Sequence, residues 1–128
     1  MYHLFLVCVG AAFGGLARFL LSGFVGRRFG ETFPWGTMVV NVTGGFAIGV
    51  VADAVMRYDM PAVWAFVITG GLGSYTTVSS FSLQTLALAR EGSWLRAGGN
   101  MLLSVSLTLA AAALGLALAG LWIGGESL

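Results

Sequence analysis

Apolar residues in this chain are grouped into four long segments, and short stretches between the segments carry most of the charge. We place membrane spans at Leu4–Phe24, Trp35–Val55, Ala62–Ala89 and Ala97–Trp122. Each segment reaches the roughly 20 apolar residues that a helix needs to cross a bilayer. Arginine, proline and glycine fill the connections, and such residues commonly mark helix ends. The pattern predicts an all-α membrane protein, with residues 1–128 forming a single four-helix transmembrane domain.

The third apolar segment is interrupted by small and polar residues. Gly70, Gly71 and Gly73 are followed by six hydroxyl side chains, at Ser74, Thr76, Thr77, Ser79, Ser80 and Ser82. Glycine loosens a helix, and irregular backbone at membrane depth is tolerated only where protein or a water-filled path satisfies its polar groups. We therefore expect a helix break near Gly73–Thr77. A break of this kind usually marks an ion or substrate site.

Composition supports a membrane protein and excludes several other classes. The chain is 58% hydrophobic and 9% charged, and its mean hydropathy is +0.92. Soluble domains carry about a quarter charged residues. The net charge of +1 provides no basic field for nucleic acid. The single cysteine, Cys8, lies in an apolar run, where we expect a small buried residue.

Arginine positions predict an orientation. An even number of spans puts both termini on one side, together with the second connection, and that side carries only Arg57. The other side carries Arg27, Arg28, Arg90 and Arg96. The positive-inside rule therefore favours a cytoplasmic location for the first and third connections.

Glycines on the first two spans predict close helix packing. They are spaced to form small helix faces, at Gly10, Gly14 and Gly15 and at Gly44, Gly45 and Gly49. Small residues let helix backbones approach closely, within or between subunits. Because four helices barely enclose a polar path, we expect an oligomer.

Polar residues inside the spans are the candidates for a functional site. Asn41 can hold the bundle together through an interhelical hydrogen bond, or it can donate to a solute in a pore. Asn100, Ser104 and Thr108 recur every four residues and form one polar stripe. The stripe serves either helix packing or a ladder of donors along the membrane normal.

Two further residues allow a structural and a functional interpretation. Phe81 lies among the hydroxyls of the third span, and most such rings face lipid or fill a core. Its electropositive ring edge can also attract an anion. Arg18, in the first span, is either a snorkelling anchor or a positive charge beside a pore vestibule.

The acidic residues and the histidine lie outside the span centres. Glu31, Asp59, Glu91 and Glu126 fall at connections or the terminus, Asp53 near a span end, and His3 at the start. No residue is placed to activate a nucleophile, so an enzyme is not expected. A small multidrug-type transporter also has four spans, but it needs a carboxylate in mid-span. A hydroxyl-rich and amide-rich lining instead suits an anion or a neutral solute.

Three motifs, taken in order, resemble the small fluoride channels of the Fluc/CrcB family. They are Gly14–Phe19, Pro34–Asn41 and Gly73–Ser82. The resemblance implies a fluoride-selective channel in the cell inner membrane that exports cytoplasmic fluoride passively. It also implies an antiparallel, dual-topology dimer surrounded by lipid. A structural sodium ion is implied at its centre, held by the backbone carbonyls of Gly73 and Thr76.

The resemblance also assigns residues to the fluoride path. Asn41, Ser104, Thr108 and Phe81 match pore positions of the family, and we include the neighbouring Ser79 in the path.

Two positions depart from the family pattern. Val78 stands where the family has the first phenylalanine of its aromatic pair, and Gln84 stands where a carboxylate is frequent. Val78 removes a ring edge from the path, and the arginine bias of four to one favours a single orientation for this chain. Together they motivate an alternative, a heterodimer with an oppositely oriented paralogue, in which the pore lined by this chain conducts weakly or not at all. A homodimer remains the other possibility.

Overall fold

The computed structural model describes residues 1–30 and 32–125, and regular structure in these residues is helical. Three long helices dominate it: α1 (Tyr2–Phe29), α2 (Trp35–Tyr58) and α6 (Trp94–Gly125). All three are long and apolar enough to cross a membrane, α6 over Trp94–Trp122. The fold is therefore that of a helical membrane protein.

The third predicted span forms several short pieces. These are α3 (Pro61–Val63), the π-helix η1 (Trp64–Leu72), α4 (Gly73–Tyr75) and, after an irregular stretch, α5 (Ser79–Arg90). The expected break is present, but the glycines are not where the chain leaves the helix. Gly73 has helical dihedral angles (φ −61°, ψ −35°), whereas Thr76 is extended (φ −80°, ψ 158°). The break thus lies at residues 76–78, on the C-terminal edge of the predicted range.

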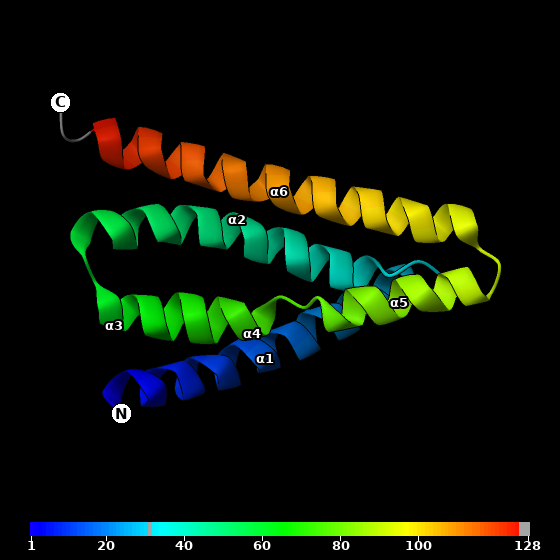
Figure 1. Ribbon diagram of the computed structural model, residues 1–128, viewed down its shortest axis with the longest axis horizontal. Coiled ribbons are helices and arrows are strands. Elements are labelled where there is room, and N and C mark those ends of the chain that lie inside the picture. The colour runs from blue at the N-terminus through cyan, green and yellow to red at the C-terminus, as the bar shows by residue number, and fades with distance from the viewer. Residues whose placement is uncertain (31, 126–128) are drawn as a thin grey trace.

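The helices lie side by side in one bundle (Figure 1). Contacts between α2 and α6 are the most extensive, followed by those between α1 and η1. The start of α1 and the last turns of α6 lie at the end of the bundle that also holds the α2–α3 connection (Figure 1). The α1–α2 and α5–α6 connections lie at the opposite end. This arrangement agrees with the grouping of the connections that we used to predict orientation.

Gly70 and Gly71 of the third segment serve packing rather than the break. A Cβ atom at Gly14 would overlap the carbonyl oxygen of Gly71, and one at Gly10 would overlap that of Phe66. In the same way, Gly70 faces the Val7 carbonyl. The helices α1 and η1 therefore touch backbone to backbone, as small residues allow between membrane helices.

The glycine face of α2 makes similar contacts on its two sides. A Cβ atom at Gly49 would overlap the Ala112 carbonyl of α6, and one at Gly44 would overlap the Thr76 side chain. The predicted close packing is confirmed at these positions. Gly15 is different, because nothing lies within 4 Å of an added Cβ atom.

Much of the apolar surface faces outward in the single chain. Large side chains such as Phe13 and Phe19 on α1 and Leu102 on α6 are exposed, which suits lipid or another subunit. Our expectation for Cys8 was wrong, because its side chain is also exposed. It lies on the outward face of α1, whereas the contact with η1 is made by glycines.

Candidate functional site

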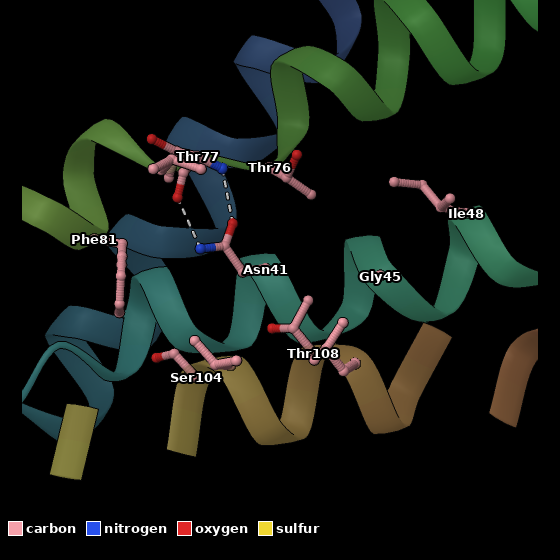
Figure 2. Close-up of a pocket in the computed structure, with 11 residues that line it drawn as sticks. Asn41, Gly45, Ile48, Thr76, Thr77, Phe81, Ser104 and Thr108 are labelled. Atoms are coloured by element: carbon pink, nitrogen blue, oxygen red, sulfur yellow. Dashed lines mark hydrogen bonds between the residues drawn. The ribbon is translucent and has the colours of Figure 1, made fainter. Parts of the chain in front are cut away.

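The site is organised by Asn41 of α2, whose side chain binds the backbone at the helix break. Its amide Nδ2 donates to the Thr77 carbonyl at 2.8 Å, and the Thr77 N–H donates to its Oδ1 at 2.7 Å (Figure 2). The amide thus pairs with one residue of the broken backbone as a neighbouring strand would. Buried backbone polar groups need partners, and here a side chain supplies them. The second Nδ2 hydrogen takes no part in this pair.

The break transfers two helical hydrogen bonds to side chains. In a continuous helix, the Thr77 N–H would bond the Gly73 carbonyl and the Ser80 N–H would bond the Thr76 carbonyl. The Thr77 N–H goes to Asn41 instead, and the Ser80 N–H goes to the Thr77 hydroxyl oxygen at 3.2 Å. The carbonyls of Gly73 and Thr76 therefore lose the donors that a helix would give them.

A cavity of about 380 Å³ opens beside the break, and we call it the helix-break cavity. It is lined by Asn41, Gly45, Ile48, Thr76, Thr77, Val78, Phe81, Ser104, Val105, Thr108 and Leu109. These residues come from α2, from the break and the start of α5, and from α6 (Figure 2). None of them carries a formal charge, so polar character comes from one amide and several hydroxyls on an otherwise apolar wall.

Most residues that the sequence singled out meet in this cavity. Asn41, Phe81, Ser104 and Thr108 line it together with Val78, although they come from three helices. Val78 lies at its rim, with 77% of its surface exposed.

The remaining candidates lie elsewhere. Ser79 is exposed and outside the lining, and its hydroxyl lies 3.3 Å from that of Thr77. Of the two residues expected to hold a cation through their carbonyls, Thr76 lines the cavity and Gly73 does not.

Arg18 lines a different cavity, of about 220 Å³, on the other side of the break. It is half-buried there beside Thr37, Thr77 and Ser80. Thr77, which is 7% exposed, belongs to the walls of both this Arg18 cavity and the helix-break cavity. The break therefore forms the partition between them.

A third cavity, of about 630 Å³, continues from the Arg18 cavity toward the α1–α2 and α5–α6 connections. The two cavities share Phe19, Ser22, Thr37 and Ser80. This inter-loop cavity is more polar, because Thr32, Gln84, Glu91 and Arg96 also line it. Gln84 Oε1 is the one buried side-chain oxygen without a hydrogen-bond partner among the described residues.

Sequence reasoning missed the particular roles of Thr77 and Thr85. In the sequence, Thr77 is one of six hydroxyl residues and has no individual role. In the structure, its carbonyl accepts a hydrogen bond from the Asn41 amide, and its hydroxyl oxygen accepts one from the Ser80 N–H. Thr85 was not considered, although its hydroxyl bonds both the Phe81 carbonyl and the Asn100 amide. A signal was available, because Thr77, Phe81 and Thr85 are spaced one helical turn apart.

A bundle of apolar helices around a broken segment, with separate cavities on its two sides, defines a membrane protein of the channel or transporter class. The family model described as "CrcB-like protein, Camphor Resistance (CrcB)" matches residues 5–116. The chain belongs to this family, and the resemblance seen in its motifs is confirmed.

Curated relatives match most of the chain. A protein of Rhodopseudomonas palustris (strain BisB18), named "Fluoride-specific ion channel FluC 2", is 57% identical over 91% of this chain and 92% of its own length. A Bradyrhizobium diazoefficiens protein of the same name is 53% identical over 88% and 85%. The "Fluoride-specific ion channel FluC" of Opitutus terrae is 52% identical over 85% and 86%.

Proposed function

We propose that this chain is a subunit of a fluoride-selective channel, through which cytoplasmic fluoride leaves the cell passively across the inner membrane. The observation that carries the proposal is the helix-break cavity, where one amide, several hydroxyls and a phenylalanine line a space without formal charge. Membership of the CrcB-like family and the names of its relatives support fluoride as the ion. Those names describe channels, and they support neither an enzyme nor a multidrug-type transporter.

Weak donors suit the passage of a small, strongly hydrated anion. The free Nδ2 hydrogen of Asn41 and the hydroxyl of Thr108 can replace part of the water shell of fluoride, and the edge of Phe81 adds positive quadrupole density. Conduction needs sites that bind well enough for entry and weakly enough for exit. Several neutral donors meet this requirement better than a fixed positive charge would.

The proposed path crosses the partition at Thr77. Fluoride would enter through the inter-loop cavity, pass Arg18, and reach the helix-break cavity beside Asn41 and Thr77. Arg28 in the last turn of α1 and Arg90 at the end of α5 flank the connections at this entrance, which the positive-inside rule places in the cytoplasm. Half-buried Arg18 would then raise the local concentration of anions just before the partition, as a vestibule charge does.

We further propose that the channel is an antiparallel dimer with dual topology. The outward apolar faces of the single chain and the open side of the helix-break cavity support a second subunit. Val78 at the rim lies where a neighbouring subunit would close the path. The partner is either a second copy of this chain or an oppositely oriented paralogue, and the missing ring at Val78 favours testing the paralogue.

A structural sodium ion is compatible with the residues at the break. The carbonyls of Gly73 and Thr76 are hard oxygen ligands whose helical donors have gone to Asn41 and Thr77. These oxygens would coordinate a bound cation, and the cation would hold the broken backbone in place. The family resemblance is what assigns these two carbonyls to the ion, and their loss of helical donors is consistent with that role.

The proposal is tested by fluoride efflux from liposomes that contain the purified chain alone. A fluoride-selective electrode follows the efflux, a potassium gradient with valinomycin sets the voltage, and chloride is the control anion. We expect rapid fluoride efflux with no measurable chloride efflux, because a narrow path with small donors selects by fit and field strength.

The outcomes separate function from subunit composition. Efflux from the chain alone would establish that copies of this chain suffice for a channel and show that Val78 is tolerated. Folded protein without efflux, followed by efflux after co-reconstitution with a paralogue, would support the heterodimer. Equal efflux of chloride and fluoride would contradict the proposed selectivity.

A further inference from the structure

A line of hydrogen bonds leads from the helix-break cavity into the contact between α5 and α6. The Ser104 hydroxyl donates to Asn100 Oδ1 at 3.2 Å, and Asn100 Nδ2 donates to Thr85 Oγ1 at 2.8 Å. The Thr85 hydroxyl then donates to the Phe81 carbonyl at 2.8 Å. Ser104 and Phe81 both line the cavity, whereas Asn100 does not. Asn100 is 1% exposed and therefore acts only through its neighbours.

Which group donates and which accepts in each of these hydrogen bonds follows from the number of hydrogens that each group has. A threonine hydroxyl has one hydrogen, and that of Thr85 goes to the Phe81 carbonyl. Thr85 must therefore accept from the amide nitrogen of Asn100, which turns the amide oxygen toward Ser104. The single hydrogen of Ser104 is then donated to Asn100, so Ser104 presents only lone pairs to the cavity.

The bond between Ser104 and Asn100 is the weakest in the line. At 3.2 Å it exceeds the 2.7 to 2.8 Å that hydroxyl donors usually show, whereas the other two bonds are 2.8 Å. A hydroxyl can rotate its hydrogen toward a new acceptor. Asn100 has no such freedom, and when Ser104 turns away its oxygen is left buried without a partner, which is costly.

We propose that Asn100 is a positioning residue that holds the Ser104 hydrogen away from the cavity and thereby weakens anion binding there. The inference rests on the proposed function and deepens it. An entering fluoride gains the Ser104 hydrogen only by taking it from Asn100, so each binding event leaves the amide oxygen unpaired. That cost keeps the site weak enough for the ion to leave, as conduction requires.

Asn100→Leu tests the proposal, because leucine keeps the branching of asparagine at Cγ and accepts no hydrogen bond. Ser104 is then free to donate, and the fluoride concentration for half-maximal flux should fall roughly three- to ten-fold, the equivalent of one net hydrogen bond. The maximal flux should fall as well, because fluoride leaves more slowly. A merely structural role would lower the flux without tightening binding.

Two further variants isolate the Ser104 hydroxyl. In a Ser104→Ala background, Asn100→Leu should no longer tighten fluoride binding, because no hydrogen remains to be released. Ser106→Ala, which removes an exposed hydroxyl two residues along α6, should leave the half-maximal concentration unchanged. Tighter binding that persists in the Ser104→Ala background would overturn the proposal.

A measurement on the natural chain tests the proposal even if the Asn100→Leu variant does not fold. The sequence contains two asparagines, Asn41 and Asn100, so nitrogen-15 labelling of asparagine gives two side-chain amides, which Asn41→Asp assigns. Fluoride, and not chloride, should shift the Asn100 amide signal in the natural chain but not in Ser104→Ala. An Asn100 signal that stays fixed while fluoride flux saturates would overturn the proposal.

The same data separate this proposal from the proposed function. Fluoride flux in the natural chain, combined with no tighter binding in folded Asn100→Leu, would refute the role of Asn100 and leave the channel function standing. A reversed amide, with Ser104 already free to donate, would give this result. If the natural chain showed no fluoride flux, alone or co-reconstituted with a paralogue, and no fluoride-dependent Asn100 shift, both proposals would be refuted.

Discussion

The two halves of the broken third segment are held in place by different forces. The π-helix η1 before the break packs on α1 at glycines, so that carbonyl groups of one helix touch Cα atoms of the other. After the break, α5 is held by two amide side chains, with Asn41 bound to Thr77 and Asn100 bound to Thr85. Phe81 lies between these two threonines in the sequence, four residues from each.

This difference separates a fixed part of the molecule from an adjustable part. Contacts between backbones leave no room for even one added methyl group, and they cannot be exchanged for other contacts. Hydrogen bonds from amide and hydroxyl groups can be exchanged with a passing ion, at a cost that the burial of each group sets. The candidate site lies on the adjustable side, and substitutions in the two halves should therefore have different effects.

The largest effect on stability is expected for Gly14→Ala on the fixed side. The added methyl group would overlap the Gly71 carbonyl, and overpacking of this kind costs about 3 kcal/mol. The loss should appear as a lower melting temperature and a smaller monodisperse fraction in detergent. Gly15→Ala is the matched control, because nothing lies within 4 Å of its added Cβ atom. Equal stability of the two variants would contradict the packing argument.

A large effect on transport is expected for Asn41→Asp on the adjustable side. The carboxylate still accepts from the Thr77 N–H but can no longer donate to the Thr77 carbonyl, which should cost about 1 to 3 kcal/mol. Its charge would repel an anion in the helix-break cavity, so fluoride efflux should fall at least roughly ten-fold in protein that still assembles. If efflux survived, Asn41 would serve the fold alone.

A smaller effect is expected for Thr85→Val, which keeps the shape of the side chain and removes the link between Asn100 and Phe81. Stability should fall by about 1 kcal/mol, measured as a shift in melting temperature. The exposed hydroxyl of Ser82 on the same helix provides the control, and Ser82→Ala should not change the melting temperature. A Thr85→Val protein as stable as the natural chain would show that the line of hydrogen bonds contributes nothing to the fold.

The smallest effect on stability is expected for Val78→Phe. Val78 is 77% exposed in the single chain, so its replacement should change stability by less than about 0.5 kcal/mol. The restored ring should nevertheless raise the rate of fluoride efflux, because it adds an electropositive edge at the rim of the cavity. An unchanged or slower rate would show that the missing ring does not limit conduction.

The helices could be predicted closely from the sequence, because apolar length decides them. The predicted span at residues 35–55 lies within α2 and the span at 97–122 lies within α6. The predicted range of the break, Gly73–Thr77, includes Thr76, where the chain leaves the helix, but it begins too early, because Gly73 is still helical. Local preference is not decisive here, because Gly70 and Gly71 pack against α1 as part of the helix, whereas Thr77 is held out of the helix by Asn41.

The residues of the candidate site were also predictable, but their connections were not. Hydroxyl and amide groups inside apolar segments are conspicuous, and most of those singled out line one cavity. The sequence left Asn41 either a structural bond or a pore donor, and the structure gives it the structural bond with one hydrogen to spare. The pairing of Thr85 with Asn100 spans two helices, and the order of residues in the chain does not show it. The subunit arrangement and the sodium ion remain predictions.

The pairing of Asn41 with Thr77 has a consequence for the way the chain is made. The two residues are 36 positions apart, and the amide is synthesised first. When the third segment enters the bilayer, the group that completes its broken backbone is already present on the preceding helix. The Thr77 N–H and carbonyl can therefore find their partner as soon as the third segment meets α2. The order of synthesis thus supplies the amide before the broken backbone needs it.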